Sequence, residues 1–149
     1  MKYYLDTEFN SFNGELLTLA LAPSNRQRAE LYLARNDINT LSVHPWVRDN
    51  VLDIIVAPGA IPHMAKLEEF PLLIRKYLAA DPDPVIVANW PDDIKYFMEC
   101  LITGPGMMIS LKSLKTKLKR CNSYPTELKG AIQHNALWDA RALRAHCEE

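Results

Sequence analysis

The sequence predicts an α/β domain built around a mixed β-sheet, and three observations support this fold class. Three stretches of β-prone residues, 3–9, 15–22 and 28–34, follow one another with short turn segments between them, which indicates an antiparallel meander. Beyond residue 40, apolar residues recur at helical spacing. Between two helical stretches lies the short apolar run 85–88, which is typical of a buried parallel strand.

Turn-forming residues bound the first three strands. The first strand opens with Tyr3 and Tyr4 and ends at the polar segment 10–14. The second ends at a Pro-Ser-Asn turn, residues 23–25, and the third covers residues 28–34. Because so little chain separates them, consecutive strands are expected to pair antiparallel.

Helices are expected in the rest of the chain. Residues 45–55 and 66–80 mix charged and apolar residues, and the second stretch places Phe70, Ile74 and Leu78 at helical intervals. A helix begins at Pro91, and the last one covers about residues 136–147. A further short helix is expected at residues 111–118, where three leucines recur at helical spacing opposite lysines.

Length and composition exclude several classes of protein. With 149 residues the chain has the size of one domain, so residues 1–149 are expected to form a single domain. Hydrophobic residues make up 48% and charged residues 23%, which excludes a disordered chain. The apolar runs are too short to cross a bilayer, and three widely spaced cysteines suit reduced thiols. We therefore expect a cytoplasmic protein with no membrane partner.

The net charge of −1 conceals a basic segment. Residues 111–129 carry six lysines and arginines and one acid, whereas the rest of the chain carries 11 basic and 17 acidic residues. Such a segment can follow a nucleic-acid backbone, although a solvated helix face is the commoner explanation of a basic run taken alone. Lys112 and Lys115 are its candidate substrate contacts.

Asp6 and Glu8 are the first candidate site. They are two positions apart on the first strand, so their side chains share one face near its C-terminal end, where α/β sheets bind ligands. Two acids on a buried face need a cation, and hard oxygen ligands suit Mg²⁺ or Mn²⁺. Taken alone the pair is a weak signal, because two solvated acids at a strand end explain it more simply.

Two further groups stand at helix starts. Asp92 and Asp93 follow the strand at 85–88, where one of them can simply cap the free backbone N–H groups of the next helix. His134 lies just before the last helix and Asp139 about one turn inside it, so both can face one point. An unperturbed imidazole pKa of about 6.5 suits proton transfer near neutrality.

Together and in this order, these groups resemble the DEDDh group of 3′-5′ exonucleases. The small mycobacterial-type exoribonucleases related to RNase T are most similar in two segments, Tyr4-Leu5-Asp6-Thr7-Glu8-Phe9 and His134-Asn135-Ala136-Leu137-Trp138-Asp139-Ala140-Arg141. These two motifs are specific and the middle one is loose. The resemblance spans nearly the whole chain. It implies a ribonuclease H-like fold, a mixed five-stranded sheet that is flanked by helices and whose first three strands are antiparallel.

The resemblance also implies which residues hold metal. Asp6, Glu8 and Asp139 correspond to carboxylates that bind two Mg²⁺ ions, for which Mn²⁺ can substitute. The fourth carboxylate is Asp93 or Asp92. Asp93 is favoured because apolar residues follow it at the first and fourth positions, as in the family.

His134 corresponds to the general base, which would take a proton from the water that attacks the terminal phosphodiester. We therefore expect a metal-dependent 3′-5′ exoribonuclease that shortens single-stranded ends and releases nucleoside 5′-monophosphates. Related enzymes are often homodimers, which makes a homodimer a further expectation. Two alternatives stay open: a DNA-directed exonuclease with the same site, and a non-catalytic nucleotide- or RNA-binding module.

Thr7 and Phe9 lie within the first motif and are expected substrate contacts. Phe9 can stack on the terminal base, and it can equally belong to the core. With Lys112 and Lys115 these residues complete the expected substrate-binding set.

Overall fold

The sheet has six strands, in the order β4-β3-β2-β1-β5-β8, within residues 1–148, which the computed structural model describes. These strands are β1 (Lys2–Phe9), β2 (Leu16–Pro23), β3 (Leu31–Arg35), β4 (His63–Ala65), β5 (Val85–Ala88) and β8 (Lys115–Leu118). β1, β2 and β3 pair antiparallel, whereas β5 is parallel to β1 and β8 is parallel to β5. The predicted mixed α/β fold with three antiparallel strands is confirmed, and it is consistent with a ribonuclease H-like fold.

The number of strands in the sheet differs from the expected five. The sheet has six strands instead of five, because the three-residue strand β4 adds to it in parallel beside β3. A separate hairpin, β6 (Ile102–Gly104) and β7 (Met107–Met108), follows the third helix.

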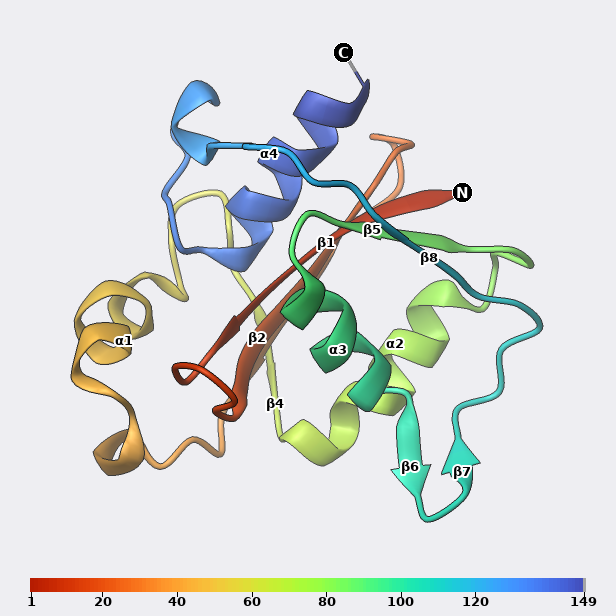
Figure 1. The fold of residues 1–149 in the computed structure, drawn as a ribbon, viewed down its shortest axis with the longest axis horizontal. Helices are drawn as coiled ribbons and strands as arrows, with labels where there is room; N and C mark the ends of the chain where they lie inside the picture. The colour runs from red at the N-terminus through yellow and green to blue at the C-terminus, as the bar shows by residue number, and fades with distance from the viewer. Residues whose placement is uncertain (149) are drawn as a thin grey trace.

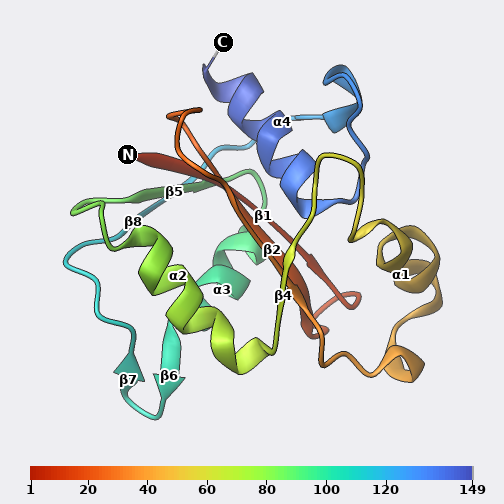
Figure 2. The ribbon, with the colours of Figure 1, turned by 180° about the vertical axis from the view of Figure 1, so that it is seen from behind.

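Helices cover both faces of the sheet (Figures 1 and 2). The last helix, α4 (Ala136–Glu148), lies on one face, and α2 (Phe70–Leu78) and α3 (Pro91–Glu99) lie on the other. The short helix α1 (Pro45–Asn50) packs beside β2. Among the described residues, no helix is long and apolar enough to span a membrane.

Alternation along β1 divides its side chains between the two layers. Tyr3 and Leu5 are buried against α2 and α3, whereas Tyr4 is buried against α4. By the same alternation, Thr7 points to the face covered by α2 and α3, and Asp6 and Glu8 point to the face covered by α4. The two acids therefore lie on the face that α4 covers.

The helix expected at residues 111–118 is wrong. Residues Lys115–Leu118 form β8, which pairs with β5 along its whole length. The leucine spacing suited a helix, but without β8 the backbone groups on that side of β5 would have no strand partner. Lys115 and Lys117 are exposed on this edge strand, where lysines discourage pairing with another chain.

A tight turn joins β1 to β2 and leaves no room for a side chain at Gly14. A Cβ atom there would lie 1.5 Å from the carbonyl oxygen of Asn10. Ser11 and Asn13 already adopt left-handed backbone conformations, with φ of 63° and 56°. The turn therefore has little capacity to adapt.

We expect Gly14→Ala to lower the free energy of unfolding by about 2–4 kcal/mol, because the turn must open to admit the methyl group. Gly106→Ala is the matched control. Its φ is +67° but its Cβ would meet open space, so it should cost only about 1 kcal/mol. Urea unfolding followed by circular dichroism measures both, and equal costs would contradict the steric argument.

Candidate active site

Three carboxylates from two elements meet on the α4 face of the sheet. Asp6 and Glu8 come from the end of β1 and Asp139 from the first turn of α4, and one oxygen of each lies within 4.8 Å of the others. Asp6 Oδ2 is buried and has no hydrogen-bond partner among the described residues. A buried carboxylate oxygen beside other carboxylates needs a cation, so this cluster fits a divalent metal ion.

Asp93 joins these acids from the other side of the strand. It lies at the start of α3 with 3% of its surface exposed. Its Oδ1 accepts two hydrogen bonds from Thr7, from the backbone N–H at 3.0 Å and from the hydroxyl at 2.7 Å. Because Thr7 stands between Asp6 and Glu8, these bonds hold Asp93 against the strand that carries them. Thr7, expected to contact substrate, thus has its hydroxyl turned to Asp93.

The choice between the two neighbouring aspartates follows from burial. Asp92 lies nearer the surface and accepts a hydrogen bond from the indole N–H of Trp90 at 3.1 Å. Asp93 is the buried one, and its charge raises the pKa of both Asp6 and Glu8. The favoured residue is therefore the one that lies beside the cluster.

Burial raises the pKa of all four carboxyl groups, and the charges of neighbouring acids raise each of them further. For Asp6, burial raises the pKa most, followed by the charges of Asp93, Asp139 and Glu8. Burial raises the pKa of Asp93 to about 7 despite the bonds from Thr7. Burial likewise raises the pKa of Asp139 to about 7, although the backbone N–H of His134 donates to its carboxylate. The cluster therefore retains protons near neutrality until a cation replaces them.

Asn135 fixes the start of α4, a role that was not predicted from the sequence. Its side chain is buried, with Oδ1 accepting from the N–H of Trp138 at 3.2 Å. Its Nδ2 donates to the carbonyl oxygen of Ile54 at 2.7 Å. The amide thus caps the helix and ties it to the segment after α1, which sets the position of Asp139. An Asn at an N-cap is a common signal, and the position could have been found from it.

His134 precedes this cap in a left-handed backbone conformation, with φ of 63°. Its ring contacts that of Trp46 edge to face, with centroids 5.2 Å apart and an interplanar angle of 81°. Partial burial lowers the pKa of His134. The imidazole is therefore neutral at pH 7, which is the form that accepts a proton.

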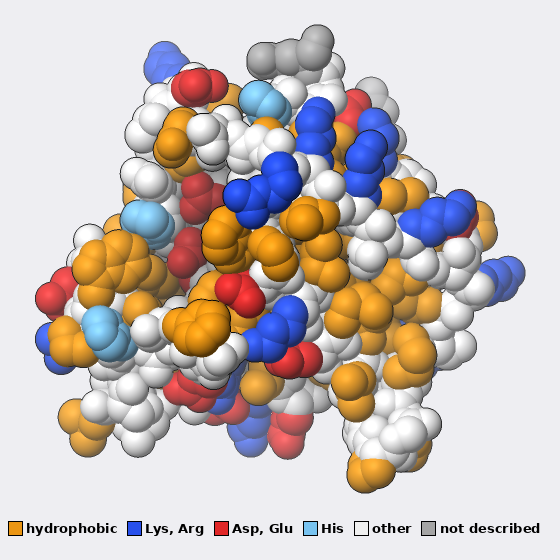
Figure 3. Space-filling view, viewed as in Figure 1, with side chains coloured by type: hydrophobic (Ala, Val, Ile, Leu, Met, Phe, Trp, Pro, Cys, Tyr) orange, Lys and Arg blue, Asp and Glu red, His pale blue; other side chains and the backbone are white. Residues whose placement is uncertain are grey.

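An aromatic groove of about 460 Å³ begins at the acids. Glu8, Phe9, Phe12, Trp46 and Trp90 are among its lining residues. Three of these aromatic side chains are half exposed or more, and Figure 3 shows acidic side chains with hydrophobic ones on either side of them. Phe9 also stacks on Tyr96, with centroids 4.6 Å apart, so it belongs both to the groove and to the packing against α3.

The structure does not bring Lys112 and Lys115 to the acids. Lys115 begins β8, level with the start of β1, and pairs with Asp83 at 2.5 Å. The acids lie towards the other end of these parallel strands. The basic segment reaches the site region instead through Arg120, whose guanidinium lies 4.9 Å from the ring centre of Trp90.

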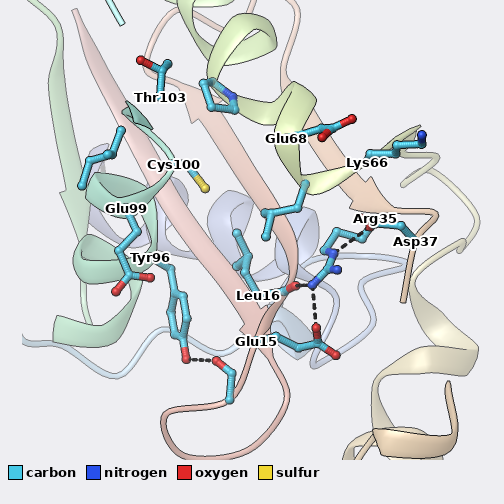
Figure 4. Close-up of a pocket in the computed structure, with 14 residues that line it drawn as sticks. Glu15, Leu16, Arg35, Asp37, Lys66, Glu68, Tyr96, Glu99, Cys100 and Thr103 are labelled. Carbon is cyan, nitrogen blue, oxygen red and sulfur yellow. Dashed lines mark hydrogen bonds and ion pairs between the residues drawn. The ribbon is translucent and has the colours of Figure 1, made fainter. Parts of the chain in front are cut away.

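A larger cavity of about 860 Å³ lies on the α2 and α3 side of the sheet (Figure 4). Arg35 is its most buried cation, and it forms ion pairs with Glu15 and Asp37, both at 2.8 Å. These partners neutralise the guanidinium, which also donates to the carbonyl oxygen of Leu16 at 3.1 Å. This cavity is built around a structural ion pair, and the clustered acids lie on the opposite face.

The raised pKa values predict how stability depends on pH without divalent ions. Carboxyl groups whose pKa is higher in the folded state bind protons there that the unfolded chain has released, so the free energy of unfolding falls as pH rises from about 4 to about 8. Asp93→Asn keeps the oxygen that accepts from Thr7 and removes one charge. We expect it to flatten this fall and to stabilise the protein by about 1–2 kcal/mol at pH 8.

Asp92→Asn is the matched control. The charge of Asp92 raises the pKa of Asp93 less than burial does, so the pH dependence of this variant should lie much closer to that of the wild type. Chemical denaturation in EDTA at about pH 5 and pH 8 measures the effect. Mg²⁺ or Mn²⁺ should restore the stability of the wild type at the higher pH, and should do so much less for Asp93→Asn. Identical slopes for the two variants would show that Asp93 is not electrostatically coupled to the cluster.

Comparison with protein-family models and with curated proteins finds no match for this chain.

Proposed function

We propose that this protein is a metal-dependent 3′-5′ exonuclease that shortens single-stranded nucleic acids, RNA in preference to DNA. One observation carries the proposal: carboxylates of Asp6, Glu8 and Asp139 lie within 4.8 Å of one another, beside a groove lined with aromatic side chains. Asp93 of α3 is tied to the same strand through Thr7, and His134 lies in the loop before α4. Acids that are buried together in this way destabilise a fold unless they bind a cation.

The carboxylates of Asp6, Glu8, Asp93 and Asp139 would hold two Mg²⁺ ions, or Mn²⁺ in their place. The donor set fits, because it consists of hard oxygen atoms, one of them buried without a hydrogen-bond partner among residues 1–148. When bound, such ions activate water and stabilise the charge that develops on a phosphate undergoing displacement.

The remaining residues of the site would handle the proton and the strand. His134, neutral at pH 7, takes the proton of the attacking water. The exposed rings of Phe12 and Trp90 offer stacking surfaces for bases at the end of the strand. Arg120, stacked on Trp90, contributes positive charge for a phosphate. The products would be a nucleoside 5′-monophosphate and a strand shorter by one nucleotide.

The preference for RNA comes from the resemblance of the two terminal motifs to exoribonucleases. A DNA-directed exonuclease would use the same carboxylates and the same histidine, so only a comparison of substrates separates the two. We also propose a cytoplasmic location, because the three cysteines are widely spaced and suit reduced thiols. By analogy with related enzymes, we propose that the protein forms a homodimer.

Digestion of a 5′-labelled single-stranded RNA and of the matching DNA, with Mg²⁺ or Mn²⁺, tests the function. We expect a ladder that shortens from the 3′ end, faster on RNA, and that EDTA abolishes. Asp6→Asn and Asp93→Asn should each lower the rate at least about 100-fold, because each removes a metal ligand. Asp92→Asn should cost less than about 10-fold, since its carboxylate bonds to Trp90 near the surface.

A strand that stays intact with both metals would refute the nuclease proposal. Titration of a nucleoside 5′-monophosphate would then show whether the site belongs to a binding module. Equal losses for Asp92→Asn and Asp93→Asn would leave the activity in place and contradict the assignment of the fourth carboxylate.

A further inference from the structure

α1 presents Trp46 to the loop that precedes α4. The indole and the imidazole of His134 meet edge to face, with ring centroids 5.2 Å apart. Their contact depends on how α1 is seated, because the two residues are distant in the chain. Trp46 also lines the groove that includes Glu8.

Hydrogen bonds connect the backbone of Trp46 to the end of β1. Asn10, which directly follows β1, donates from Nδ2 to the carbonyl oxygen of Ser42 at 3.0 Å. Its Oδ1 accepts from the N–H of His44 at 2.7 Å. His44 Nδ1 in turn accepts from the N–H of Trp46 at 3.2 Å. The same strand end that carries the acids therefore sets the start of α1.

A separate apolar cluster holds α1 against the sheet. Val43, Val47 and Val51 are buried, and they pack with Leu17 of β2. This cluster lies under α1 and fixes its orientation, while Trp46 on the outer side is 51% exposed. The backbone beneath Trp46 is therefore rigid although its ring is open to solvent.

His134 needs such support, because its backbone is left-handed. For a residue with a Cβ atom this conformation is strained, and it persists only where neighbouring groups hold it. On one side Asn135 is anchored to the carbonyl oxygen of Ile54. On the other side the group that touches the imidazole ring is the indole of Trp46.

We infer that Trp46 is a positioning residue, which holds the His134 imidazole in the orientation that accepts the proton of the attacking water. The inference rests on the proposed function and adds a residue that no motif in the sequence indicates. Asn135 fixes the backbone of the loop and Trp46 fixes the ring. Removing the indole leaves the base present and free to rotate away.

A double-mutant cycle tests the inference. Trp46→Leu removes the ring and Trp46→Phe keeps an aromatic edge, and both are made with His134 intact and with His134→Asn. Asparagine tolerates the left-handed backbone and supplies no base. Cleavage of single-stranded RNA with Mn²⁺ is followed over a range of substrate concentrations, so that kcat and KM are separated.

With His134 intact, we expect Trp46→Leu to lower kcat about 10-fold or more with KM changed less than about twofold, and Trp46→Phe to retain kcat within about threefold. With His134→Asn, Trp46→Leu should change kcat less than about twofold. A loss that falls on KM, or one of equal size in both backgrounds, overturns the inference and makes Trp46 a substrate contact. Leu72→Ala on α2, an exposed residue of the opposite layer, controls for general effects of truncation.

A second readout does not need activity. The ring protons of His134 should shift in the NMR spectrum of Trp46→Leu, because the ring current of the indole is removed. Unshifted resonances overturn the inference even if the enzyme is active. Wild-type protein that cleaves neither RNA nor DNA overturns the proposed function and this role with it, whereas additive losses in an active enzyme overturn this role alone.

Discussion

Repulsion among buried carboxylates is the constraint on which the rest of this structure depends. Four acids occupy one end of the sheet, where burial and the charges of neighbouring acids raise the pKa of each. Such a cluster opposes folding at neutral pH, so the rest of the chain must supply the stability that it removes. The fully buried side chains on both faces of β1, with Tyr3 and Leu5 on one and Tyr4 on the other, do this immediately beside the acids.

β1 also solves a geometric problem, because carboxylates from both layers of the fold have to meet at its end. Alternation turns Asp6 and Glu8 to the α4 face, where Asp139 arrives on the first turn of the helix. Thr7 points the other way and binds Asp93 at the start of α3. A single strand therefore collects carboxylates from helices on opposite sides of the sheet, and any shift in its register by one residue would exchange the two sets.

What the sequence predicts well is local. Asp6 and Glu8 share a face because a strand has a period of two, and the Val85–Ala88 strand is legible as a short apolar run. The features that the sequence does not predict depend on contacts with residues far away in the chain. The leucines of residues 111–118 have helical spacing, but the open side of β5 draws that segment into the sheet, and Lys115 moves away from the acids with it. The apolar residues that follow Asp93 favour it over Asp92 by resemblance to the family. The two aspartates differ in burial only because α3 packs against the sheet.

The same distinction explains why Trp46 has no sequence signature. The residues next to Trp46 in the chain hold α1 in place: His44 caps the helix and the valines beneath it pack against the sheet. Capping and packing residues of this kind are common, so they do not mark a functional site. Its contact with His134 arises only because Asn10 ties α1 to the end of β1 while Asn135 ties α4 to the segment after α1. Two asparagines thus bring a groove residue and a histidine together from separate elements. An acidic site cannot attract a phosphate by its own charge, so in the proposed enzyme the other aromatic residues of the groove would hold the strand, while Trp46 would hold the imidazole of His134.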